Sequence, residues 1–118
     1  MYCLFSKFLY IGCMVDLTQM SLEQFQENAG EAAKLLKALS NESRLMILCQ
    51  LGEGEKQVAE LQLGLSQSAL SQHLARLRDD GLVEARRQGT AVFYSISDPS
   101  ALKLIGTLAE IYCPPSAG

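Results

Sequence analysis

Apolar residues recur at helical spacing over the first half of the chain. Ser21 with Gln24 three positions later is typical of a capping box, so a helix is expected from about 21 to 39. Ser40 or Asn41 then caps a second helix, which carries the apolar run LMILC and ends at Gly52.

The middle of the chain predicts two further helices separated by a tight turn. The segment QVAELQLGL, residues 57–65, places Val58, Leu61 and Leu65 at helical spacing and breaks at Gly64. Ser66 then caps the helix SQSALSQHLARLRDD, in which Leu65 and four later apolar residues form the stripe that packs on the core.

Strand-like runs follow Gly81, which closes that helix. LVEARRQ and AVFYSIS predict two strands, with Gly89 in a hairpin turn between them. Asp98-Pro99 opens a last helix that runs to about Cys113. This order predicts a mainly α fold with a small β-hairpin wing, the winged helix-turn-helix.

Composition indicates one small folded domain, because the 118 residues are 48% hydrophobic and 19% charged. We expect residues 1–20 to be a poorly ordered extension or a start assigned too early, with Met14 or Met20 as the true beginning. Residues 21–113 are expected to form the DNA-binding and dimerisation domain, followed by a tail at 114–118.

Neither a membrane nor a protein-wide attraction to nucleic acid is indicated. No apolar run approaches the roughly 20 residues of a membrane span. The match to a secretory signal is weak, so a cytoplasmic protein is expected. The net charge is −3, but residues 66–97 hold four arginines against three acidic residues, which allows a local basic surface.

Two groups of polar side chains are candidates for contacting DNA. Glutamine can pair bidentately with adenine, serine can bond a base edge or phosphate, and guanidinium groups suit phosphates or the minor groove. The candidates on the fourth predicted helix and on the hairpin are Gln67, Ser68, Ser71, Gln72, His73, Arg76, Arg86 and Arg87. An ordinary solvated surface is the alternative, and His73 also suits a half-buried position between the two faces.

The last predicted helix is apolar on two stripes, which one small domain does not easily cover. Together with the first helix it predicts a homodimer that presents two recognition helices about 34 Å apart to double-stranded operator DNA.

These segments resemble the ArsR/SmtB family of bacterial winged-helix repressors. The similarity is carried by LLKALSNESRLMIL and VAELQLGLSQSALSQHLARLRDDGLVEARRQGTAVFYSIS, and SALSQHLARLRDDGLV is its most specific part. It implies a homodimer that represses its operator until an inducer acts. Metal-sensing members carry Cys-x-Cys where this chain has Gln57 and Ala59, and the last helix has no histidine, so no metal or other cofactor is expected.

Cys49 and Cys113 are similar in position to the thiols of the branch that senses reactive sulfur species, which includes BigR, SqrR and HlyU. The resemblance implies that per- or polysulfides link the two sensor thiols, weaken operator binding and so control genes of sulfide detoxification. Cys3 and Cys13 lie outside the resemblance and receive no role.

The residues alone leave other interpretations open. A single cysteine in an apolar run is often a small buried hydrophobe. A general oxidant sensor would use the same two thiols, and a winged helix that binds protein would use the same fold. An enzyme is not expected, and no catalytic residue is assigned, because the chain has no C-x-x-C motif and His73 is its only histidine.

Overall fold

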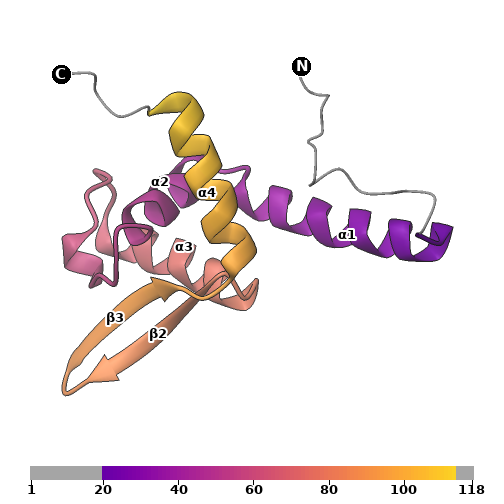
Figure 1. The fold of residues 1–118 in the computed structure, drawn as a ribbon. Helices are drawn as coiled ribbons and strands as arrows, with labels where there is room; N and C mark the ends of the chain where they lie inside the picture. The colour runs from indigo at the N-terminus through magenta and orange to yellow at the C-terminus, as the bar shows by residue number, and fades with distance from the viewer. Residues whose placement is uncertain (1–19, 114–118) are drawn as a thin grey trace. The chain divides into compact units, whose positions relative to one another are not determined.

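The computed structural model describes residues 20–113. In that range the elements follow the order of a winged helix-turn-helix (Figure 1). They are α1 (Leu22–Leu39), α2 (Glu42–Leu51), the 3₁₀ helix η1 (Val58–Glu60), α3 (Gln67–Asp79), β2 (Val83–Gln88), β3 (Ala91–Ile96) and α4 (Pro99–Tyr112). Apart from Met20, the expected N-terminal extension and the C-terminal tail lie outside the described residues.

The chain divides between Lys34 and Leu35 into two units, each described by itself. The first contains the greater part of α1, where the Ser21 hydroxyl accepts from the Gln24 backbone N–H at 3.1 Å, one half of the predicted capping box. Leu22 and Phe25 are exposed apolar side chains on this segment. Among residues 20–113, no helix is both long and apolar enough to cross a membrane.

Short polar side chains start the helices of the second unit. Asn41 caps α2 by accepting from the Arg44 N–H at 3.0 Å, and Ser66 caps α3 through the Ala69 N–H at 3.1 Å. Asp98 caps α4, and Pro99 occupies its first turn, where a missing N–H costs nothing. The helix starts predicted at these residues are confirmed.

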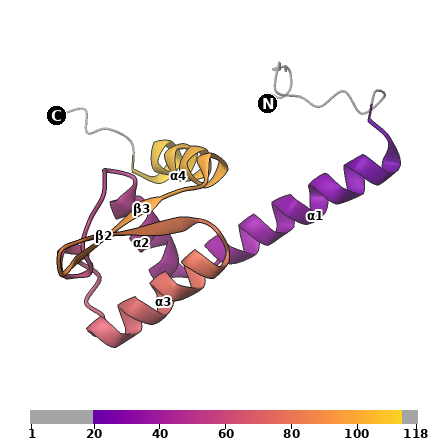
Figure 2. The same cartoon turned by 90° about the horizontal axis from the view of Figure 1, so that it is seen from below.

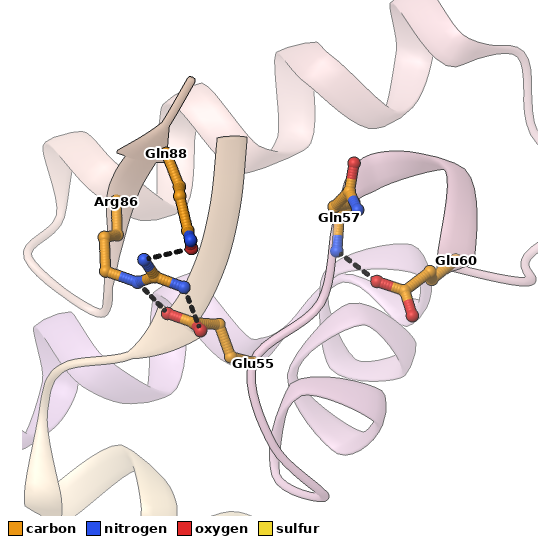
Figure 3. A network of polar contacts seen from close by, with 5 residues as sticks. All are labelled: Glu55, Gln57, Glu60, Arg86 and Gln88. Atoms are coloured by element: carbon orange, nitrogen blue, oxygen red, sulfur yellow. Dashed lines mark hydrogen bonds and ion pairs between the residues drawn. The ribbon is translucent and has the colours of Figure 1, made fainter. Parts of the chain in front are cut away.

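The helix expected over residues 57–65 is wrong in extent, because only the 3₁₀ turn of η1 forms there. The Gln57 N–H is taken by the Glu60 carboxylate at 2.7 Å (Figure 3), and Leu61 is already extended, with φ −81° and ψ 126°. The Gln50 side chain of α2 then holds the backbone of Gln62 from both sides, with its amide N–H at 3.2 Å from the Gln62 oxygen and its carbonyl at 2.9 Å from the Gln62 N–H. The helical spacing of apolar residues therefore does not decide the structure after Glu60, because the contact with Gln50 holds the chain extended.

The core lies in the second unit, around α2, which packs against both α3 and α4 and lies between them (Figure 2). Aliphatic side chains from the helices and from the start of β2 fill it. Its buried members are Ala38, Leu39, Ile47, Leu48, Leu51, Leu61, Leu70, Leu74, Leu77, Leu82, Val83, Ala101 and Ile105. Leu65, expected in the packing stripe of α3, is instead 38% exposed because it precedes the Ser66 cap and lies outside the helix.

The wing is the antiparallel pair β2–β3, paired from Val83↔Ile96 to Gln88↔Ala91 and extending away from the helices (Figure 1). Its turn is Gly89-Thr90, and Gly89 adopts φ +63°, which favours glycine. Lys56 extends the sheet by an isolated bridge to Tyr94, with two backbone hydrogen bonds of 3.0 and 2.8 Å. The segment after α2 therefore runs beside β3 as a third, very short edge.

Gln50→Ala is expected to lower the free energy of unfolding by about 1 kcal/mol, because both hydrogen bonds to the Gln62 backbone are lost near the surface. Denaturant unfolding at a fixed protein concentration measures the change. Gln62→Ala is the matched control, since Gln62 contributes only its backbone to this contact. Equal losses in the two variants would contradict the assignment.

Candidate functional site

The polar face of α3 is exposed to solvent. Leu70, Leu74 and Leu77 are buried on the opposite side, which fixes the rotation of the helix about its axis. The exposed candidates from the sequence are Gln67, Ser68, Ser71, Gln72 and Arg76. The Ser68 hydroxyl lies 3.2 Å from that of Ser66, and Arg76 forms an exposed pair with Asp80 at 3.3 Å, a weak interaction on a helix surface. His73 is half-buried, between the two faces.

The two wing arginines differ sharply in their surroundings. The Arg86 guanidinium donates to both carboxylate oxygens of Glu55, at 2.9 and 2.7 Å, and to the Gln88 side chain at 3.0 Å (Figure 3). It also lies 4.8 Å from the centre of the Phe93 ring. Arg87 is exposed and forms no ion pair or side-chain hydrogen bond with any residue between 20 and 113. DNA contact by Arg86 stays a prediction, with most of its donors already used within the chain.

Glu55 is the site residue that the sequence did not single out. The hydrogen bonds from Arg86 lower the pKa of its carboxyl, and the positive charge of Arg86 acts in the same direction against partial desolvation. The same contacts raise the pKa of Arg86. The two residues are 31 positions apart, so no local spacing signals the pair.

The thiols of Cys49 and Cys113 are free and exposed. Cys49 lies on α2 and Cys113 is the C-cap of α4, two helices that pack against each other. Burial by neighbouring atoms raises the pKa of Cys49, and the charge of Cys113 raises it further. Cys49 is exposed, so the interpretation of this residue as a fully buried packing residue is wrong.

Nothing in residues 20–113 gathers three or more histidine, cysteine, aspartate or glutamate side chains into a group that would hold a metal ion. The site consists of three parts. They are the polar face of α3, the wing, in which Arg86 is bonded within the chain and Arg87 is not bonded to any residue between 20 and 113, and the thiols of Cys49 and Cys113. These features define the class of winged helix-turn-helix regulators of transcription.

Comparisons with known proteins agree with this class. Residues 41–85 match the family model of bacterial regulatory proteins of the arsR family. The transcriptional activator HlyU of Vibrio cholerae is 49% identical over 96 residues, covering 80% of this chain and 89% of HlyU. The chain belongs to the ArsR family. Its relatives are regulators of transcription, a class of proteins that are not enzymes.

Solved structures show the same fold. Reduced HlyU from Vibrio cholerae superposes with a TM-score of 0.74 at 49% identity, over 78% of this chain and 99% of that one. The transcriptional repressor BigR from Xylella fastidiosa gives 0.72 at 44% identity, over 80% and 98%. A homodimeric winged helix-turn-helix DNA-binding domain from Mycobacterium bovis gives 0.65 at 32% identity, over 79% and 87%. The predicted family, its dithiol branch and the winged fold are confirmed.

Cys49 is expected to titrate above the ordinary thiol pKa, so its alkylation by iodoacetamide should speed up about tenfold per pH unit from pH 7 to 8. Cys113→Ser should move the Cys49 pKa part of the way back, because the charge of Cys113 is removed while the burial remains. Peptide-mapped mass spectrometry gives the rate at each pH. Cys13→Ser, which removes a thiol outside the described residues, is the control, and a Cys49 pKa below the ordinary value would contradict the assignment.

Proposed function

We propose that this chain is a homodimeric repressor that binds operator DNA in its reduced form and leaves it when Cys49 and Cys113 are linked by reactive sulfur species. One observation carries the proposal: the two thiols are free and exposed, on two helices that pack against each other. The identity to HlyU and BigR supports the same conclusion. The operator-bound protein acts in the cytoplasm, where thiols are kept reduced.

The chemistry needs no protein-bound cofactor. The Cys49 thiolate attacks the outer sulfur of glutathione persulfide, which gives a Cys49 persulfide and releases glutathione, and Cys113 reacts in the same way. The Cys49 persulfide anion then attacks the Cys113 sulfur and expels hydrogen sulfide, which leaves a trisulfide. Two thiols and two persulfides thus yield one trisulfide, two molecules of glutathione and one of hydrogen sulfide.

Oxidation by peroxide is the competing route. Peroxide converts one thiolate to a sulfenic acid and water, and the second thiol then displaces water to form a plain disulfide. The raised pKa of Cys49 keeps its thiolate fraction small at neutral pH, and this slows attack on peroxide and on persulfide alike. A longer sulfur bridge also spans a wider gap than a disulfide, which needs Cα atoms within about 7 Å. Only the length of the bridge separates the two reagents: if the reduced pair is held too far apart for a disulfide, sulfur transfer closes the gap and peroxide does not.

The thiol pair is connected to α3, the helix to which we assign DNA reading, through the packing of α2. A covalent link between Cys49 and Cys113 constrains α2 against α4, and α2 also packs against α3. A small shift of α2 therefore moves α3, and the two α3 helices of a dimer no longer have the spacing that matches the two halves of the operator.

DNA reading is assigned to the exposed face of α3, with Gln67, Ser68, Ser71 and Gln72 near its start and Arg76 one turn later. His73, Arg86 and Arg87 complete the predicted set. The Mycobacterium bovis relative is described as a homodimer, and exposed apolar side chains on α1 and α4 are available for the same assembly here. They include Leu22, Phe25, Leu36, Leu102 and Ile111.

HlyU is described as an activator and BigR as a repressor, so relatives act in both directions. We infer repression from the resemblance to the family, and genes of sulfide detoxification as the targets. One solved relative is described as reduced, which makes the oxidation state a variable to control in every assay.

Glutathione persulfide is expected to produce a Cys49–Cys113 link heavier than a disulfide by whole sulfur atoms, and to release a DNA duplex that the reduced protein has selected from a random-sequence pool. Mapped mass spectrometry and fluorescence anisotropy measure the two events. Cys49→Ser and Cys113→Ser should stay bound. A plain disulfide formed by persulfide and hydrogen peroxide alike would make the protein a general oxidant sensor, and no link with either reagent would remove the thiol mechanism.

Replacement of Gln67 and Ser71 by alanine should abolish the preference for the selected duplex over random DNA, because each lost base contact costs about 1–3 kcal/mol of discrimination. Arg87→Ala should weaken binding to both duplexes equally, since phosphate contacts carry no sequence information. Competition anisotropy separates the two effects. Equal loss of sequence preference in all variants would refute the assignment of base reading to α3.

A further inference from the structure

Arg86 is held from three sides by residues of two different segments. Its guanidinium lies 4.8 Å from the ring centre of Phe93, the residue paired with it in the hairpin. It also reaches the Glu55 carboxylate on the segment after α2 (Figure 3). Gln88, two residues further along β2, receives a third hydrogen bond on the same face of the strand pair. The fork-to-fork pair with Glu55 and the stacking on Phe93 together fix the plane of the group.

This arrangement ties the wing to the body of the domain at two points. Lys56, the residue after Glu55, is bridged through its backbone to Tyr94 on β3. The side-chain pair Glu55–Arg86 reaches one strand further, to β2. Without it, the edge after α2 holds β3 alone, and β2 is connected to that edge only through the hairpin.

Arg87 has the opposite surroundings. Successive residues of a strand point to opposite faces, so its side chain leaves the hairpin on the side away from Arg86. It is exposed and unengaged by residues 20–113, next to the turn at Gly89-Thr90. The direction of the Arg87 side chain therefore depends on how firmly β2 is held.

We propose that Glu55 is a positioning residue for DNA binding: with Arg86 it forms a brace that fixes β2, so that Arg87 and not Arg86 meets the phosphate backbone. The inference rests on the proposed DNA-binding function and narrows its predicted set of contacts: of the two wing arginines, only Arg87 contacts DNA, and Arg86 holds the strand. Both side chains of the brace are part-exposed, at 49% and 35%, so the pair contributes little to overall stability and acts on position.

The sign of one substitution separates the brace from simple electrostatics. Glu55 is an anion near the DNA-binding wing, so removal of its charge alone would strengthen binding to DNA. If Glu55 merely competed with phosphate for Arg86, Glu55→Gln would likewise strengthen binding. The brace predicts the opposite, because the phosphate contact of Arg87 is lost when the part of β2 next to the turn is no longer fixed at Arg86, although its pairing with β3 remains.

The experiment measures how the affinity of the reduced, full-length protein for the selected duplex depends on salt concentration. Each lost phosphate contact lowers the logarithmic slope by about 0.9 in magnitude. Glu55→Gln and Arg87→Gln are expected to lower the slope by the same amount, and the double variant by no more than Arg87→Gln alone. Glu84→Gln removes the same charge from an exposed position on β2 without touching the brace, and its slope should not fall.

Arg86→Lys supplies an independent readout. It keeps the positive charge but cannot make the two-pronged contact, so it should behave like Glu55→Gln if Arg86 is part of the brace, and nearly like the unsubstituted protein if Arg86 only offers charge to a phosphate. Thermal unfolding of all variants checks that the fold is intact. If Glu55→Gln does not fold, Arg86→Lys carries the test.

An unchanged or steeper slope in Glu55→Gln, or additive losses in the double variant, would overturn the brace while DNA binding itself stands. If the unsubstituted protein selects no duplex, the proposed function and the brace fall together. The two failures are thus distinguishable by the unsubstituted protein alone.

Discussion

The burial of one apolar side of α3 against α2 is the constraint on which the rest of the structure depends. Leu74 and Leu77 are fully buried, together with Ile47 and Leu48 of α2. Each such side chain contributes about 1.5–3 kcal/mol when removed from water, which is a large share of the stability of a domain this small. Because this contact fixes the rotation of α3, the same geometry that forms the core also turns Gln67 and Ser71 to solvent.

Much of this arrangement could be predicted from the sequence, because the signals are local. Asn41, Ser66 and Asp98 cap helices at the predicted places, and Gly89 marks the hairpin turn. The local pattern gave a wrong prediction where a side chain from a distant part of the chain bonds to the backbone. Gln50 of α2 satisfies the backbone of Gln62, so the helical pattern after Glu60 does not continue. No periodicity in a single segment reveals such a contact.

In the candidate site, too, local features could be predicted from the sequence and features that depend on distant residues could not. The polar face of α3 follows from its spacing, whereas the exposure of Cys49 did not, since the run RLMILCQL is apolar on nearly every side of its helix. Only the packing of α2 against two partners decides that Ile47, Leu48 and Leu51 turn inward and Cys49 outward. The Glu55–Arg86 pair was equally out of reach, because its partners are brought together by the bridge between Lys56 and Tyr94.

α2 and the segment after it contribute to three different features of the domain. Its inner side forms the core, its outer side presents a thiol, and the segment after its C-terminus holds the wing through Glu55 and Lys56. A thiol on a surface loop would react equally well with an inducer, but it would not be packed against the elements to which we assign DNA binding. Cys49 lies on α2, which supports α3 directly and, through the three residues 52–54 that lead to Glu55, the wing as well. Under the proposed function, a covalent change at Cys49 is thus coupled to α3 by packing and to the wing by the short segment after α2, without a separate relay of side chains.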